Sequence, residues 1–200
     1  MVKLFVEGGG DDQSLKTECR QAFTKLIERA GCKGKMPRVI ACGTRRSAFE
    51  QFCKSLEGDE SALLLVDSEE PIGSPDQHSP WLHVKTRQGD HWEQPKDATD
   101  KQLHLMVECM ESWFLADPKA LKAFYGSNFQ ANKLPKSKPE RTSKLDVYAK
   151  LADATKQAKT KGKYGKGSHS FKLLGRLDPQ KIEAECPWAA RFFTSLRELG

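Results

Sequence analysis

Two short apolar runs that each end at carboxylates constrain this chain most. Residues 2–6 lead into Glu7, and residues 62–66 lead into Asp67 and Glu69. Runs of this length and composition are typical of strands buried on both faces of a parallel sheet. In such sheets the functional groups lie at the carboxyl ends of the strands, which is where these acids fall. The chain is therefore predicted to be an α/β protein with acids along one edge of its sheet.

These acids predict a site for a divalent metal ion. Neighbouring strands lie about 4.8 Å apart, so acids at the ends of two nearby strands can share one cation. The spacing of two between Asp67 and Glu69 would put both side chains on one face of an extended segment. A carboxylate such as Glu7 is costly to bury without a partner. We expect Mg²⁺, or Mn²⁺ in its place, because hard ions take carboxylate oxygens.

A run of three glycines, Gly8–Gly10, follows the first apolar run. Glycines allow a tight turn with positive φ and let a phosphate or a solvated ion approach the backbone. The run has neither the lysine of a Walker P-loop nor the Rossmann glycine spacing. The alternative is a simple turn from strand to helix, with Asp11 or Asp12 as the helix N-cap.

The composition is that of one moderate domain. The 200 residues are 38% hydrophobic and 30% charged, which is enough for a real core. We expect a cytoplasmic protein without a membrane partner, because there is neither a run of about 20 apolar residues nor a cleavable signal pattern. The six cysteines are widely spaced and without interleaved histidines, so they indicate neither a zinc site nor a disulfide framework.

Positive charge is concentrated late in the chain. The net charge is +6, and residues 133–176 carry many lysines and arginines but few acids. A polyanion is the expected partner, and the nucleic acid could be DNA or RNA. The candidate phosphate-binding residues are Lys161, Lys163, Lys166 and Lys172. The alternative is a solvated lysine-rich loop, above all over residues 156–163.

Strand and helix patterns alternate in the first half of the chain, which predicts a parallel sheet with right-handed crossovers. The predicted strands are 2–6, 37–42, 62–66 and 103–107, with helices at 11–30 and 45–56. Residues 71–100 are predicted to form a loop over the site. Helical segments follow at 118–125, 139–155, 168–175, 179–185 and 187–199. We therefore divide the chain into an α/β core, 1–117, and a mainly helical basic extension, 118–200, packed on the same domain.

Two glutamates lie in apolar surroundings after the fourth predicted strand. Apolar residues crowd around Glu108 and Glu111, so at least one of them is expected to be partly buried. A buried glutamate needs a metal, a cation or a proton. The alternative is a helix face on which one of the two acids is solvated. Glu108 is then expected to be the solvated one, in preference to Glu111.

Four short motifs occur in order along the chain. They are Glu7-Gly8-x-x-Asp11, Asp67-x-Glu69, Glu111-x-Trp113 and Tyr164-x-Lys166-Gly167-x-His169. Together they resemble the Toprim fold, the metal-binding domain of topoisomerases, primases and OLD-type nucleases. The closer resemblance is to bacterial single-domain Toprim-like proteins, which are often encoded beside an ABC-type or SMC-like ATPase and associated with phage defence. Asp11 stands where a glutamate is common in that family.

The resemblance implies a three-layer fold with a mostly parallel sheet, and a Mg²⁺-dependent nuclease subunit that works with an ATPase. Glu7, Asp67 and Glu69 would then hold one or two ions, and Asp11 and Glu111 would complete or orient the shell. The metal would lower the pKa of a bound water and align it against a phosphodiester.

The same resemblance suggests roles for two later residues. Lys166 and His169 would neutralise transition-state charge or protonate the leaving group. For His169 the alternative is an ordinary residue at a helix start. Two other functions stay open for the whole chain: a non-catalytic nucleic-acid-binding or regulatory subunit of an ATPase complex, and a phosphohydrolase acting on nucleotides.

Overall fold

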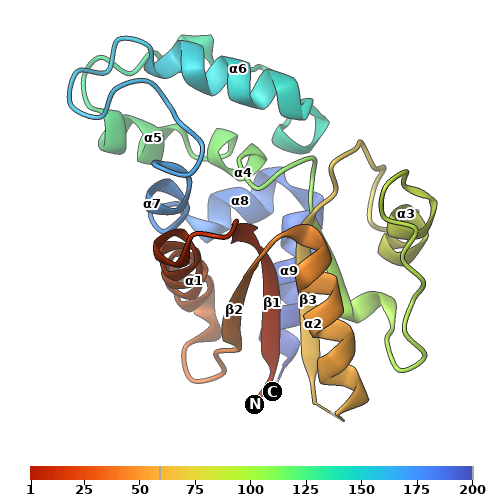
Figure 1. Ribbon diagram of the computed structural model, residues 1–200. Helices are drawn as coiled ribbons and strands as arrows, with labels where there is room; N and C mark the ends of the chain where they lie inside the picture. Colours follow the sequence, from red (N-terminus) through yellow and green to blue (C-terminus); the bar gives the residue numbers. More distant parts are fainter. Residues whose placement is uncertain (59, 200) are drawn as a thin grey trace.

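A four-stranded parallel sheet forms the centre of the computed structural model, which describes residues 1–58 and 60–199 (Figure 1). The strands lie in the order β2-β1-β3-β4, and the pairings β1·β2, β1·β3 and β3·β4 are all parallel. Their bounds are β1 (Lys3–Gly9), β2 (Arg38–Gly43), β3 (Ala62–Asp67) and β4 (Leu103–Met106). The predicted α/β class is confirmed. The sheet was expected to be mostly parallel, and every strand pairing in the described residues is parallel.

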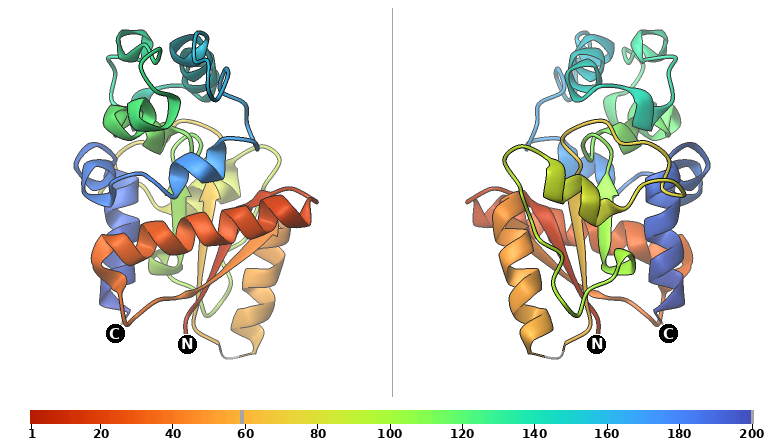
Figure 2. Two further views of the ribbon diagram at one scale, coloured as in Figure 1. Left: turned by 90° about the vertical axis from the view of Figure 1, so that its left-hand side faces the viewer. Right: turned by 90° about the vertical axis from the view of Figure 1, so that its right-hand side faces the viewer.

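Helices cover both faces of the sheet, which gives three layers. Alternate residues of one strand enter different clusters: Leu4 and Val6 pack with α1 (Gln13–Ile27) and α9 (Pro187–Glu198). Phe5 packs on the other side, in the cluster formed by α2 (Arg45–Glu57) and α3 (Pro80–Thr86). Figure 2 shows α2 and α9 on opposite sides of the strands. All six residues of β3 are buried, as expected for a run that is apolar on both faces.

The first crossover helix begins and ends close to the predicted positions. Asp12 is its N-cap and accepts a hydrogen bond from the Leu15 N–H at 3.0 Å. Beyond Ile27 the chain continues as a π-helical turn, Glu28–Cys32, in which Gly31 has a φ of 90°. This left-handed glycine ends the helix predicted over 11–30.

The remaining helices gather mostly at the carboxyl edge of the sheet. They are α4 (Ser112–Leu115), α5 (Pro118–Tyr125), α6 (Lys144–Thr155), α7 (Ser170–Leu174) and α8 (Pro179–Glu185). We call residues 118–174, which contain α5, α6 and α7, the helical cap. In Figure 1 α5 and α6 lie above the carboxyl ends of the strands, whereas α9 returns beside the sheet. Residues 118–199 thus contribute both a cap over the site and one helix of the core.

The prediction of a loop over residues 71–100 is wrong for part of that segment. Ser79 caps α3 by accepting the Leu82 N–H at 3.3 Å, and Pro80 occupies the first turn, where a missing N–H costs nothing. Trp81 and Val84 are buried against the sheet. The apolar side chains in this polar segment dock it on the face of the sheet that it shares with α2.

The helix predicted over 139–155 also begins later than expected. Pro139–Arg141 form a single 3₁₀ turn, and α6 begins at Lys144. Ser143 is the N-cap and accepts the Asp146 N–H at 3.1 Å.

None of the helices in the described part of the chain is long and apolar enough to cross a membrane.

Glu140 joins the turn before α6 to the start of α9, which predicts a pH dependence of stability. Its carboxylate accepts the Trp188 N–H at 3.1 Å and the Ala189 N–H at 3.2 Å. Burial raises the pKa of Glu140 from 4.5 to about 7, although these two donors oppose the shift. A folded-state pKa above the unfolded value means that ionisation costs stability, so this contribution falls as the pH rises from about 4.5 to about 7.

We therefore expect Glu140→Gln to remove that part of the pH dependence. Relative to Glu140→Gln, the wild-type free energy of unfolding should decrease by about 1–2 kcal/mol between pH 5 and pH 8. Urea denaturation at the two pH values measures this difference. A difference between the two proteins that does not change with pH would contradict the assignment.

Candidate metal centre

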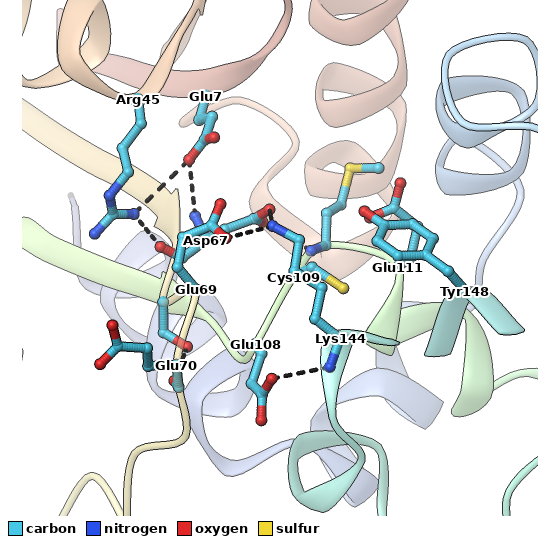
Figure 3. Close-up of polar contacts among 12 residues, drawn as sticks. Glu7, Arg45, Asp67, Glu69, Glu70, Glu108, Cys109, Glu111, Lys144 and Tyr148 are labelled. Atoms are coloured by element: carbon cyan, nitrogen blue, oxygen red, sulfur yellow. Dashed lines mark hydrogen bonds and ion pairs between the residues drawn. The ribbon is translucent and has the colours of Figure 1, made fainter. Parts of the chain in front are cut away.

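Three carboxylates gather at the carboxyl edge of the two central strands (Figure 3). One oxygen from each of Glu7, Asp67 and Glu69 lies within 4.8 Å of the others. Glu7 belongs to β1 and Asp67 ends β3, and these strands are direct neighbours in the sheet. We call these three residues the carboxylate triad.

Burial makes two members of the triad, Glu7 and Asp67, costly in their charged form. Asp67 is 6% exposed, and its Oδ1 accepts the Met110 N–H at 2.8 Å. Burial, and then the charges of Glu7 and Glu111, raise the pKa of Asp67 well above its ordinary value. Burial also raises the pKa of Glu7, against the effect of Arg45. Two carboxylates with raised pKa values in one place favour the binding of a cation.

Glu69 joins the triad through a turn, and not through the pleat of a strand. Strand β3 ends at Asp67, and Glu69 has a left-handed φ of 64°. Its N–H donates to the Glu108 carbonyl at 2.9 Å, which holds the turn against the segment after β4. The prediction of an extended segment from Asp67 to Glu69 is therefore wrong, although the two side chains still bring oxygens within 4.8 Å of each other.

Two cations that the sequence did not reveal contact the triad. Lys144 Nζ lies 2.5 Å from Glu69 Oε2 and 3.6 Å from Asp67 Oδ2. Burial lowers the pKa of Lys144, but the charges of Asp67 and Glu69 outweigh it and raise the pKa overall. Arg45 Nη1 lies 3.8 Å from Glu7 Oε2 and also donates to the Asp67 carbonyl.

Both cations are held in place by further contacts. The backbone N–H of Lys144 donates to Glu108 Oε2 at 2.8 Å. The Arg45 guanidinium is paired with Asp90, with Nη2 2.6 Å from Oδ2, and lies 4.7 Å from the centre of the Trp92 ring. No local pattern around Lys144 or Arg45 points to the triad, and Lys144 is 75 residues away from Glu69.

We expect Lys144→Met to destabilise the protein when no divalent metal is present. The change would leave two poorly hydrated carboxylates without their nearest cation, which should lower the free energy of unfolding by about 1–3 kcal/mol in EDTA. Saturating Mn²⁺ should restore more stability to this variant than to the wild type. Urea denaturation with EDTA or Mn²⁺ measures both effects.

Lys150→Met is the matched control, because Lys150 is exposed on the same helix. It should change neither quantity. Equal stability of Lys144→Met and wild type in EDTA would mean that Lys144 does not compensate the triad.

Glu111 is buried, but hydroxyl groups occupy its oxygens. The side chain is 1% exposed. Its Oε1 accepts hydrogen bonds from Tyr164 Oη and Ser170 Oγ, and its Oε2 accepts one from Tyr148 Oη, each at 3.0 Å. Burial and the negative charge of Glu111 raise the pKa of both tyrosines, so they remain donors. This arrangement ties the segment after β4 to the helical cap.

Neither glutamate after β4 is solvated. Glu108 is 9% exposed and is paired with the backbone of Lys144. The alternative in which Glu108 faces solvent therefore does not hold. Glu111 lies outside the carboxylate triad, so the structure gives this predicted metal ligand a different set of partners.

A cavity of about 420 Å³ adjoins the triad beneath the helical cap. It is lined by acids (Glu7, Asp11, Asp12, Asp67, Glu111), by glycines (Gly8–Gly10, Gly43, Gly167), by Leu15, Met110 and Phe171, and by Lys166 and Ser170. Asp11 is exposed at the edge and is not part of the triad. Gly9 has a φ of 90°, and a Cβ on it would lie 2.7 Å from the backbone of Lys16, so this turn requires glycine.

The chain was also compared with known proteins. A family model described as a domain of unknown function (DUF4276) matches residues 6–197. The chain belongs to the DUF4276 family. Neither a curated protein nor a solved structure matched it. The DUF4276 match includes the triad, the helical cap and most of α9, so it extends over both parts into which the sequence was divided.

In this DUF4276 chain His169 does not line the cavity. It stands at the N-cap position of α7, and its Nδ1 lies 3.0 Å from Tyr125 Oη. Its ring packs edge-on against Phe124. Burial, and then the charges of Lys172 and Lys161, lower the pKa of His169. The structure therefore places His169 at a helix start, outside the set of residues that line the cavity.

The four candidate lysines of the DUF4276 chain are exposed, but only Lys166 lines the cavity. Lys166 Nζ lies 5.3 Å from the centre of the Tyr148 ring. Lys161 lies over Phe124, and Lys172 Nζ is 3.9 Å from Glu18 Oε1. Together with Lys163 they form an exposed basic segment on the helical cap and at its edge.

Proposed function

We propose that this protein is a Mg²⁺-dependent nuclease subunit that hydrolyses phosphodiester bonds of nucleic acid. The observation that supports the proposal is the carboxylate triad, in which Asp67 is buried and adjoins a cavity. Carboxylate oxygens are the donors that Mg²⁺ and Mn²⁺ prefer. The parallel sheet with acids at its carboxyl edge also agrees with the proposed Toprim-like relationship.

Glu7, Asp67 and Glu69 are the residues that would hold the ion. A divalent ion bound there would activate water and stabilise negative charge on the phosphate. Arg45 orients Glu7 and, through its bond to the Asp67 carbonyl, the end of β3. Lys144 is the cation nearest the triad, and Lys166 stands at the edge of the cavity. We assign to these two lysines the neutralisation of phosphate charge, and we no longer assign it to His169.

The exposed lysines of the cap would bind the nucleic-acid backbone without reading its sequence. Contacts of this kind are sensitive to salt, since cations released from the phosphates drive binding. The ATPase partner and the role in phage defence remain predictions from the resemblance. Co-purification of the protein with an ATPase encoded beside it would test them.

The test is cleavage of supercoiled plasmid and of total tRNA by the purified protein with Mg²⁺, Mn²⁺ or EDTA. We expect cleavage that needs the metal and is absent in Glu7→Gln. The exposed Glu57, at the end of α2, provides the control variant Glu57→Gln, which should cleave like the wild type. Cleavage that persists in Glu7→Gln or in EDTA would contradict the proposal.

A second candidate function is favoured by the position of Lys144. Its ammonium group lies against two members of the triad and neutralises part of their charge without a metal. The triad would then be structural, and the protein would be a non-catalytic nucleic-acid-binding or regulatory subunit. Titration with Mn²⁺ separates the two: a nuclease binds the ion through the triad, whereas a structural triad already compensated by Lys144 does not.

A further inference from the structure

The cavity beside the carboxylate triad has two different walls. Leu15, from the first turn of α1, lines it together with Met110 and Phe171. The backbone of Gly8–Gly10 forms another side. A Cβ on Gly8 would lie 3.1 Å from Phe171 Cζ, so the absence of a side chain there lets the ring pack against the turn. The floor carries the carboxylates of Glu7 and Asp67.

Two members of the triad, Glu7 and Asp67, face this cavity. Asp67 is only 6% exposed and lines the cavity with Glu7. A phosphate that approaches an ion held by these residues from the cavity brings the sugar and base bonded to it into the cavity. About 420 Å³ is within the range of pockets that hold one small molecule, which is the size of a single nucleotide rather than of a duplex.

The chemistry of the cavity suits one nucleotide. Proteins that hold an unstacked base place it against apolar and aromatic side chains, which Leu15, Met110 and Phe171 supply. Lys166, exposed at the edge, offers a positive charge to the phosphate side. The segment that carries it is held by Tyr164 and Ser170, whose hydroxyls donate to the buried Glu111.

We propose that this cavity binds a single unpaired nucleotide, with its base against Leu15, Met110 and Phe171, so that the substrate is single-stranded nucleic acid or an unpaired strand end. The inference rests on the proposed nuclease function for its substrate, but the cavity itself can be tested by binding alone. The substrate class that follows is a nucleic-acid strand whose bases can unstack from their neighbours.

The first experiment measures binding by calorimetry in Mg²⁺. The probes are dTMP and UMP, with ribose 5-phosphate as the probe that lacks a base. We expect the better of the two nucleotides to bind at least about tenfold more tightly than ribose 5-phosphate, because only it has a base to bury against the apolar wall. Equal affinity for ribose 5-phosphate would overturn the proposal.

A variant that fills the cavity tests the location. Leu15 is half-buried, and its Cδ1 lies 3.8 Å from the position of a Cβ on Gly167, so a larger side chain at Leu15 would close the space between α1 and the cap. Leu15→Trp should weaken nucleotide binding at least about tenfold and leave Mn²⁺ binding unchanged. Leu145→Trp is the control, because Leu145 is 83% exposed. Unchanged nucleotide binding in Leu15→Trp would overturn the proposal.

A second variant covers the case in which Leu15→Trp does not fold. Leu15→Ala keeps the cavity open and removes part of its apolar wall, so nucleotide binding should weaken by several-fold. Circular dichroism and thermal unfolding establish that the variant is folded. Nucleotide affinity equal to that of the wild type would place the base elsewhere.

Cleavage of matched single-stranded and blunt duplex oligonucleotides distinguishes this inference from the function on which it rests. We expect the single strand to be cut at least about tenfold faster, and the difference to be lost with Leu15→Trp. Equal cutting of both substrates by the wild type and by Leu15→Trp would overturn the inference and leave the nuclease function standing. Nucleotide binding without any cleavage would overturn the nuclease function and leave the cavity assignment standing.

Discussion

Asp67→Asn is expected to abolish metal-dependent cleavage while leaving the metal-free protein at least as stable as the wild type. The loss of activity should be at least about 10²-fold, since removal of outer partners of a metal ligand alone costs 10- to 100-fold. Asn keeps the oxygen that accepts the Met110 N–H at 2.8 Å. It removes a charge that burial and the neighbouring Glu7 and Glu111 disfavour. Cleavage rates and urea denaturation in EDTA measure the two effects.

The gain in stability expected for Asp67→Asn is limited, because Lys144 loses one of its two partners in the triad. We therefore expect a gain of no more than about 1 kcal/mol. Asp153→Asn, at an exposed position of α6, should change neither activity nor stability. A large loss of stability in Asp67→Asn would mean that this carboxylate stabilises the fold. It would contradict the account in which the fold keeps the carboxylate buried for binding a cation.

Trp113→Ala is expected to cause the largest loss of stability, about 3–5 kcal/mol. Trp113 is fully buried. Its ring centre lies 6.4 Å from that of Phe23 in α1, and 6.3 and 6.1 Å from those of Phe192 and Phe193 in α9. The substitution would open a cavity where the segment after β4 meets helices from both ends of the chain. Equilibrium urea denaturation measures the loss.

Leu82→Ala is the control for Trp113→Ala, because Leu82 is 60% exposed, and it should change the stability by less than about 0.5 kcal/mol.

The packing of Trp113 against α9 also predicts that residues 1–117 do not fold without α9, since they would expose Trp113 and the sheet face that α9 covers. A folded fragment 1–117, or a small effect of Trp113→Ala, would contradict this account of the core.

The sequence by itself determined the sheet and the acids at its edge. The apolar run of β3 is buried along its whole length, and Glu7 and Asp67 follow neighbouring strands. These features could be predicted because burial on both faces leaves a continuous apolar run, and because parallel strands end on the same side. The start of α1 was also readable, since its Asp12 cap depends on neighbouring residues alone.

Only the tertiary structure decided what surrounds those acids. How the helical cap packs over the sheet decides that Lys144 meets Glu69, which partners Glu111 has, and that His169 contacts Tyr125. The burial of Trp81, which turned part of a predicted loop into α3, is of the same kind. Local patterns specify an element and the face it buries, whereas the pairing of side chains distant in sequence is fixed by packing, and such pairs leave no periodic trace in the sequence.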